Sequence, residues 1–300
     1  MSRVRKRNFL FLLVLMLFVG SYARHRHYGH LIDVAGHLQD KQMNEISGIA
    51  ASGISKDIFY VHNDSGDTSR VFAITADGKL KNTIYYNGDP SELLAVADVE
   101  DIAVGPGPNA GASYIYMGDI GDNGAKRKSI TIYRIQEQKN WKDSVIHTTA
   151  APLHLTYPDG PKDAEALMLD PIGKVLCIVS KRQDTVGIYT TPLDYKPGES
   201  RVLTLRGKLH FTGFPPLKWI TAGDISRDGS QILLKNYQKV YYWARTGNEP
   251  IWQTMMRPAR ELSYEQEKQG EAIGFTHDGK AYYTVSEGIF SPIYHYNSPQ

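Results

Sequence analysis

The sequence predicts an all-β protein that folds as a single propeller, and the main evidence is a six-residue phrase that recurs about every 55 residues. Each copy begins with an acidic or polar residue, and most copies carry another acidic or polar residue in the third slot. The copies are Glu45–Ala50, Asp98–Ala103, Asp163–Met168, Thr221–Ser226 and Gln269–Gly274. Short apolar runs separated by turn signals, together with a globular composition of 41% hydrophobic and 22% charged residues, point the same way.

Each copy opens a group of short predicted strands, in which Asp-Gly pairs such as Asp77-Gly78 mark hairpin turns. The first group has 46–50, 58–62, 71–74 and 80–86, and the second has 99–104, 114–117, 130–135 and 153–157. In the third group, 175–179, 187–190 and 202–209 follow the phrase; in the fourth, 232–234, 240–243 and 251–255 do so. The fifth has only 272–276, 281–285 and 292–296, with a surface connector predicted at 261–269 before it.

The fifth group lacks a strand, and an open sheet edge needs a cover. Residues 29–35 read as a strand and can supply the missing one, which would close five four-stranded blades into a ring. A six-bladed ring is the alternative. It would need another blade in the longest interval, between Glu100 and Glu165, where the pattern supplies strands for one blade. Five blades are therefore favoured.

The N-terminal segment reads as a signal peptide over residues 1–23, followed by the propeller over 24–300. Four basic residues precede an apolar run at 9–19, which is short for a membrane span, and small residues lie at Ser21 and Ala23. An uncleaved anchor is the alternative. Export to a periplasm or the exterior is expected, and cleavage would change the formal charge from +2 to −2, which argues against a nucleic-acid partner. The one cysteine, Cys177, is expected to be buried.

In a propeller the first strand of each blade lines a central channel, so alternate residues of the phrase should face the axis. Aligning the copies on their shared Ile or Leu places Ser47, Glu100, Glu165, Gly223 and Glu271 in one layer. Glu45, Asp98, Asp163, Thr221 and Gln269 form a second layer. Asp224 lies out of register unless its strand contains a bulge.

Carboxylates crowded around one axis need a counter-charge. Oxygen ligands suit a hard cation, with Ca²⁺ the first choice and Mg²⁺ the second. The predicted ligands are Ser47, Glu100, Glu165 and Glu271. A water-filled channel with polar plugs is the alternative.

A second polar set follows the second strand of each blade, where the chain leaves the sheet at one mouth of the channel. The candidates for catalysis in this set are Asp64, Asp119, Lys181, Arg182 and Lys235. Acids that hold a metal beside bases that hold an anion suit phosphoryl chemistry, with a small phosphate compound as ligand or substrate. The alternative is that the acids form turns and the bases are solvated.

These motifs together resemble the calcium-activated nucleotidases, or apyrases. The resemblance rests on Glu-Ile-Ser with Asn-Asp-Ser-Gly, Val-Glu-Asp-Ile-Ala with a Gly-Asp loop, Ala-Glu-Ala with Lys-Arg, Ile-Leu-Leu-Lys and Gly-Glu-Ala-Ile. It implies a five-bladed propeller with calcium in the channel that hydrolyses nucleoside di- and triphosphates. The four predicted ligands would then match the calcium ring. The phrases are also similar to those of phytase-like exported bacterial propellers.

Three functions stay open at this point. The first is a metal-dependent phosphohydrolase. The second is a non-catalytic, monomeric propeller that binds a ligand or a protein and keeps a structural metal. The third is a lactonase or aryl esterase on a six-bladed ring, which is less favoured because such sites prefer Asn- and Asp-rich metal layers with a histidine, and this mouth is basic instead.

Overall fold

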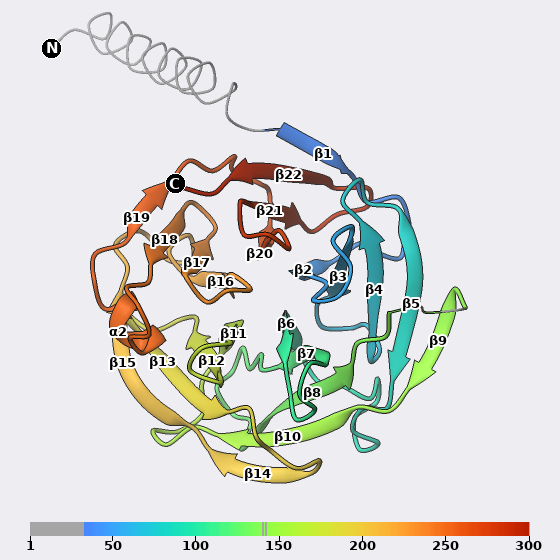
Figure 1. Ribbon diagram of the computed structural model, residues 1–300. Helices are drawn as coiled ribbons and strands as arrows, with labels where there is room; N and C mark the ends of the chain where they lie inside the picture. The colour runs from blue at the N-terminus through green and yellow to red at the C-terminus, as the bar shows by residue number, and fades with distance from the viewer. Residues whose placement is uncertain (1–32, 140, 142, 300) are drawn as a thin grey trace, which may run out of the picture. The chain divides into compact units, whose positions relative to one another are not determined.

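The computed structural model describes residues 33–139, 141 and 143–299, and it confirms the predicted all-β fold. Five sheets stand in a ring around a central channel, so that one strand of each sheet lies at the axis (Figure 1). The predicted signal peptide, 1–23, lies outside the described residues. Within those residues there is no helix with the length and apolar character needed to cross a membrane.

The five blades follow one another along the chain, each built from neighbouring antiparallel strands. Blade one contains β2 (Ile46–Ala51), β3 (Ile58–Asn63), β4 (Arg70–Thr75) and β5 (Leu80–Tyr86). Blade two contains β6 (Val99–Pro106), β7 (Ser113–Asp119), β8 (Ile130–Gln136) and β10 (Ala151–Thr156). Blade three contains β11 (Ala164–Asp170), β12 (Val175–Ser180), β13 (Thr185–Pro192) and β15 (Thr204–His210). Blade four contains β16 (Ile220–Ile225), β17 (Gln231–Asn236), β18 (Val240–Ala244) and β19 (Arg260–Leu262).

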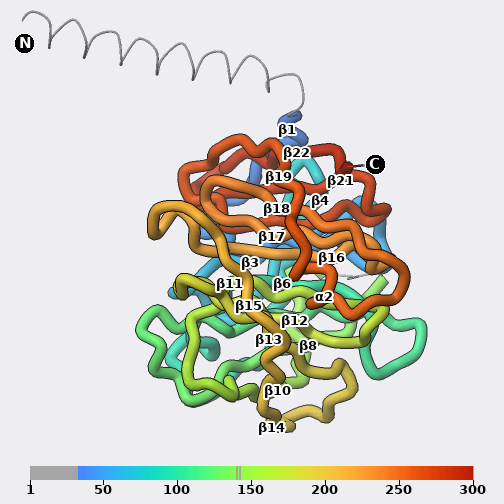
Figure 2. Tube along the Cα trace, turned by 90° about the vertical axis from the view of Figure 1, so that its left-hand side faces the viewer, coloured from blue at the N-terminus to red at the C-terminus, as the bar shows by residue number. Residues whose placement is uncertain are grey.

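Blade five closes the ring as the sequence predicts. Its strands β20 (Gly270–Phe275), β21 (Ala281–Ser286) and β22 (Pro292–Asn297) are completed by β1 (Asp33–His37), which lies beside β22 (Figures 1 and 2). The closing strand was expected at 29–35, and residues 29–32 fall outside the described part of the chain. The first and last blades are therefore joined through the outermost strand.

The six-bladed alternative is wrong, because the long interval between the second and third phrases contains no extra blade. Its additional strand, β9 (Val145–Thr148), pairs in parallel with β5 on the outer edge of blade one. A second unpredicted strand, β14 (Glu199–Val202), pairs in parallel with β10 on blade two. Each connection thus reaches back and covers the exposed edge of the preceding blade.

The strand predicted at 251–255 is the main correction to the expected elements. The segment forms a short helix, α2 (Ile251–Met255), and β19, which overlaps the start of the predicted 261–269 connector, takes the outer position of blade four. Ile251, Thr254 and Met255 are buried, which is the spacing of a helix face. Pro250 precedes the helix, and the Thr254 hydroxyl donates to the Glu249 carboxylate at 2.9 Å. This burial pattern decides against a strand.

The hydrophobic core lies between blades rather than at the centre. Four clusters of buried apolar side chains join blades one and two, two and three, three and four, and five and one. The last of these contains Ile49 and Phe72 from blade one with Val285 and Ile293 from blade five, so the closing interface is as apolar as the others. Cys177 is buried in the interface between blades three and four, as expected.

A buried ion pair also joins blades three and four. The Arg245 guanidinium donates to both oxygens of Asp170, at 2.6 and 3.0 Å, and both side chains are almost fully excluded from solvent. Asp170 also accepts from the backbone N–H of Ile172 at 3.0 Å. Both oxygens of this buried carboxylate therefore accept hydrogen bonds from donors in the protein.

Candidate metal centre

All five inner strands contain the same irregularity at the start of the strand. In each, one residue is left out of the pairing with the second strand, and these residues are Ser47, Glu100, Glu165, Thr221 and Glu271. A bulge of this kind re-aims a side chain and bends the strand locally. The predicted layer that contains Ser47, Glu100, Glu165 and Glu271 is therefore correct in blades one, two, three and five. In blade four the prediction is wrong by two residues. There Thr221, and not Gly223, is the counterpart of the glutamates.

This shift also places Trp219 and Asp224. Trp219 is the counterpart of Asp98 and Asp163, so blade four presents an indole where its neighbours present carboxylates, and the Arg182 guanidinium lies 4.5 Å from the centre of that ring. Asp224 lies three residues beyond the bulge, away from the acidic mouth. Its carboxylate accepts from the backbone N–H groups of Ile225 at 2.8 Å and of Phe275 at 2.7 Å. Asp224 thereby ties blade four to blade five.

Asp224 gives a first testable expectation. Burial raises the pKa of Asp224 to about 7, so the folded protein keeps a proton that the unfolded chain loses above pH 4. The stability contributed by this group then falls as pH rises from about 4 to about 7. Asp224→Asn should cost most near pH 4 and progressively less toward pH 7, measured by denaturant unfolding against the exposed control Asp57→Asn. A cost that grows with pH would show that the two N–H donors outweigh burial.

Seven carboxylates converge at the mouth where the inner strands begin. They form three groups in which the ligand oxygens all lie within 4.8 Å of one another. The groups are Asp64, Asp98 and Glu100; Glu100, Asp163 and Glu165; and Asp64, Glu271 and Glu287. Because Asp64 and Glu100 are each shared by two groups, the acids form one continuous chain across four blades.

The electrostatics of this mouth favour a cation. Burial raises the pKa of Asp98 to about 7, with further contributions from Asp64 and Asp163. Burial, then Asp64 and Asp98, raise the pKa of Glu100 well above its usual range. Two unit negative charges 5 Å apart repel by about 3 kcal/mol at an effective dielectric constant of ~20. Positive charge in the mouth would remove that cost.

The carboxylates also keep unused oxygens. Asp98 Oδ1 and Glu165 Oε2 are buried and have no hydrogen-bond partner among the described residues. Buried acceptors are normally satisfied, so two orphans in one cluster indicate a missing donor or cation. Gly121 leaves the necessary space, because a Cβ at this residue would collide with Glu100 Oε1 and with the Asp98 carboxylate.

The space above Gly121 leads to a second expectation. Gly121→Ala would push the Asp98 and Glu100 carboxylates apart or fill the gap between them, so the affinity for a divalent cation should fall at least tenfold. Calcium titration followed by the shift in melting temperature measures this change. Gly124→Ala is the matched control, because a Cβ there meets only the flexible Lys126 side chain at 3.5 Å. Equal calcium affinity in both variants would contradict the assignment.

The predicted basic residues lie at this mouth, but each already has a partner. Lys181 pairs with Glu165, and Arg182 pairs with Asp163 and also donates to Asn123. Lys235 is fully buried and donates to the backbone carbonyl of Gly270, with its ammonium 4.8 Å from the centre of the Tyr264 ring. Burial lowers the pKa of Lys235 to about 8.

The two predicted catalytic acids have different surroundings. Asp119 accepts from the N–H groups of Ala97 and Asp98, both at 3.0 Å, and pairs with Arg127 at 2.7 Å. It positions Asp98 and has no free oxygen directed at the mouth. Asp64 is half-buried and belongs to two of the acidic groups.

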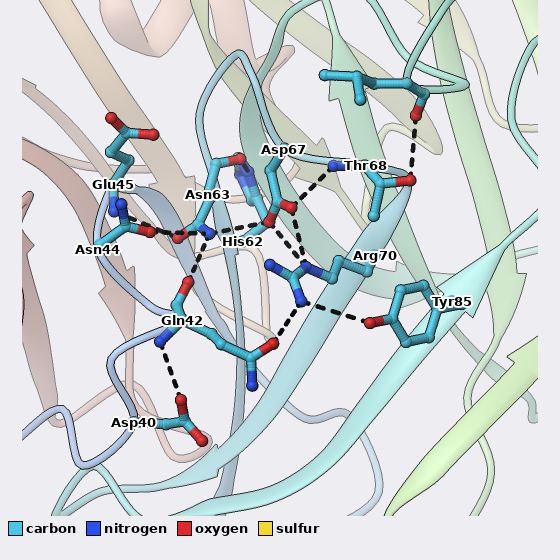
Figure 3. A network of polar contacts seen from close by, with 11 residues as sticks. Asp40, Gln42, Asn44, Glu45, His62, Asn63, Asp67, Thr68, Arg70 and Tyr85 are labelled. Carbon is cyan, nitrogen blue, oxygen red and sulfur yellow. Dashed lines mark hydrogen bonds and ion pairs between the residues drawn. The ribbon is translucent and has the colours of Figure 1, made fainter.

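A polar network holds the loop that carries Asp64 (Figure 3). On one side of it, Asn63 donates to the backbone carbonyl of Gln42 at 2.7 Å and to Asp67 at 2.8 Å. On the other side, Asp67 accepts from Arg70 Nε at 2.9 and 3.0 Å. The Asn-Asp-Ser-Gly-Asp motif thus forms a turn, and its Asn63 and Asp67 hold that turn in place through hydrogen bonds. Asp64 is the residue of the motif that belongs to the acidic groups.

The four predicted ligands do not lie in a single group: three of them belong to two acidic groups, and the fourth, Ser47, contacts the backbone of blade two. Glu100 and Glu165 lie together, and Glu271 lies with Asp64 and Glu287, where it also accepts from the Tyr237 hydroxyl. The Ser47 hydroxyl donates to the backbone carbonyl of Glu100 at 2.7 Å.

Several residues of the site were missing from the predicted set. Asp98 and Asp163 were placed in the second layer but not among the ligands, and Glu287 was not among the predicted ligands. Asp98 and Asp163 each lie two residues before the bulged residue of an inner strand. Glu287 directly follows the second strand of blade five. Trp219 and Tyr237 carried no such signal.

The chain matches no protein-family model and no curated protein. The fold and the acidic groups therefore rest on the structure itself. The resemblance to the calcium-activated nucleotidases and to phytase-like propellers stays a prediction from short motifs.

Proposed function

We propose that the acidic mouth binds a divalent cation, calcium first and magnesium second, and that the protein uses this cation to hold a phosphate-bearing anion. The observation that carries the proposal is the pair of unpartnered buried oxygens, Asp98 Oδ1 and Glu165 Oε2, within one chain of seven carboxylates. Asp64, Asp98 and Glu100 are the best ligands, because none of the three carboxylates pairs with a lysine or an arginine in the described part of the chain. Hard oxygen ligands of this kind suit Ca²⁺.

Binding of a phosphate is supported by the bases next to the acids. Lys181 and Arg182 line a hollow of about 390 Å³ together with Trp219 and Tyr237. Lys181 pairs with Glu165 and Arg182 with Asp163, two acids grouped with Glu100, so a cation that also contacts these two carboxylates would free the bases for an anion. Guanidinium and ammonium groups beside a divalent cation form a combination that recognises phosphate.

Hydrolysis of the bound phosphate ester or anhydride is the second candidate function. Asp64 favours it, because this half-buried acid lies at the edge of the cluster and could orient a water molecule. Asp119 does not support it, since its oxygens are occupied by two backbone N–H groups and Arg127. The bound cation would supply charge neutralisation for the phosphate.

The deciding experiment is thermal unfolding of the full-length chain with a chelator, with calcium and with magnesium, alongside phosphate release from ATP, ADP and phytate. A rise of several degrees with calcium and no phosphate release supports the binding function. A rise with release supports the hydrolase. The absence of any shift at millimolar calcium would overturn the metal centre.

The anion-binding part has its own test. Lys181→Ala should weaken binding of inorganic phosphate to the calcium-loaded protein at least fivefold in a calorimetric titration. Lys280→Ala, at an exposed lysine whose ammonium lies 4.0 Å from Asp278, is the matched control and should leave binding unchanged. Equal losses in both variants would exclude a specific role for Lys181.

Export is part of the same proposal. The basic and apolar pattern over residues 3–23 supports secretion to a periplasm or to the exterior, where calcium is abundant enough to occupy an exchangeable site. We expect a monomer there. Fractionation of the expressed chain and the mass of its mature N-terminus test both the destination and the cleavage after Ala23.

A further inference from the structure

The opposite mouth of the channel contains a second cavity that the acidic groups do not reach. All five blades contribute to its wall, because it lies where the inner strands end rather than where they begin. Its volume is about 290 Å³, at the lower end of the range for small-molecule sites. About half of the wall is apolar, with contributions from Ala50, Val104, Leu169, Ile225 and Phe275, and the other half is polar.

One guanidinium stands at this mouth without a carboxylate partner. Arg227 is exposed on the cavity rim and takes part in no ion pair among residues 33–139, 141 and 143–299. Its Nη1 donates to His277 Nε2. The remaining donors of the guanidinium fork are free to bind an anion.

The neighbouring histidine fixes the direction of that arginine. His277 Nδ1 lies 2.8 Å from the backbone carbonyl of Ser52, which can only accept, so Nδ1 carries the proton and Nε2 is left to accept from Arg227. These two hydrogen bonds connect Arg227 of blade four to His277 of blade five, and His277 to Ser52 of blade one, across the mouth. Arg227 is therefore held at the cavity entrance instead of extending into solvent.

The hydroxyl groups of Ser52, Ser226 and Thr276 in the wall already donate to the carboxylates of Glu137, Asp228 and Asp278, whereas Ser113 Oγ has no hydrogen-bond partner among the described residues. Asp224 lines the wall, but each of its oxygens accepts from a backbone N–H group, of Ile225 or of Phe275. A ligand should therefore place its charged end at the rim and its apolar end among the aliphatic and aromatic side chains. The apolar side chains of the wall, together with a guanidinium at the entrance that has no ion-pair partner in the described part of the chain, are complementary to a short hydrocarbon chain that ends in a carboxylate.

We propose that this second mouth binds a small apolar monocarboxylate, with the carboxylate on Arg227 and the hydrocarbon inside the cavity. The proposal does not depend on the metal centre, because the two sites share no residue. It assigns the two ends of the channel to different ligand classes, a cation with its phosphate at one end and an apolar acid at the other.

The test is calorimetric titration of the full-length chain with hexanoate, with hexanamide as the uncharged probe of the same length. Hexanoate should bind saturably and at least fivefold more tightly than hexanamide. Arg227→Gln should remove that preference, while Arg260→Gln, at an exposed arginine of β19 outside the cavity, should keep it. Val104→Phe should abolish binding of both probes by filling the cavity.

Two results would overturn the proposal. One is the absence of saturable hexanoate binding to protein whose melting curve shows that it is folded. The other is an Arg227→Gln variant that binds hexanoate as tightly as the wild type. Because Arg227 is exposed, the fold is expected to tolerate that substitution, so the second result stays interpretable even where Val104→Phe disturbs packing.

Discussion

Arg245→Ala is expected to lower the free energy of unfolding by about 3–5 kcal/mol, the usual cost of leaving one partner of a buried ion pair alone. The substitution removes both guanidinium donors from the Asp170 carboxylate, which lies at the interface of blades three and four and has no exposed surface, and leaves only the backbone N–H of Ile172. Denaturant unfolding at neutral pH measures the loss. Lys280→Ala is the control. It breaks a pair whose side chains are 85% and 55% exposed, so it should cost less than about 1 kcal/mol.

A double variant separates the pair from its surroundings. Arg245→Met with Asp170→Leu replaces both charges by apolar groups and should recover most of the stability lost in Arg245→Ala, because no uncompensated charge is left. A double variant as unstable as the single one would mean that Arg245 acts mainly through its bonds to backbone carbonyls, from Nε to Glu249 at 2.7 Å and from Nη1 to Gly229 at 3.3 Å.

Glu100→Gln is expected to abolish stabilisation by calcium. If calcium binds as proposed, a hundredfold excess over its dissociation constant adds about 2.7 kcal/mol to the unfolding free energy of the wild type. The amide keeps the size of the side chain but removes the charge that two acidic groups share. The measurement is chemical unfolding with calcium and with a chelator, for the wild type, Glu100→Gln and the exposed control Asp57→Asn.

The unfolding free energy measured with the chelator distinguishes loss of calcium binding from misfolding of the variant. Without calcium, Glu100→Gln should be as stable as the wild type or more stable, since it relieves the repulsion among Asp64, Asp98 and Glu100. Asp57→Asn should respond to calcium as the wild type does. A variant that loses stability equally in both conditions would show that Glu100 is structural and that the cation binds elsewhere or not at all.

Much of the fold followed from local pattern. The repeated phrase fixed the number of inner strands, and alternating apolar runs predicted most of the blade strands because both signals depend on neighbouring residues. The helix α2 was missed because Ile251-Trp252-Gln253-Thr254-Met255 is short and apolar, and such a run fits a strand or a helix until its buried face is known. The added strands β9 and β14 were missed because their partners belong to a different blade.

The register of the inner strand in blade four is another feature that the local sequence pattern could not predict. Aligning Gly223 with the glutamates respected the apolar residues of the phrase, yet the bulge places Thr221 there, with Trp219 two residues before it. A bulge is defined by pairing with the next strand, so a single strand's sequence cannot locate it.

The sequence by itself determined a five-bladed ring, its closure by an N-terminal strand, and a set of acids directed at one end of a channel. Periodicity and residue type are sufficient for these features. Only the tertiary structure decided which acids lie together and that Lys181 and Arg182 are already paired with two of those acids. It also decided that Arg227, at the other mouth, bonds to His277 and has no ion-pair partner in the part of the chain that is described. Those facts depend on distances between blades, and distances between blades are set by packing around the whole ring.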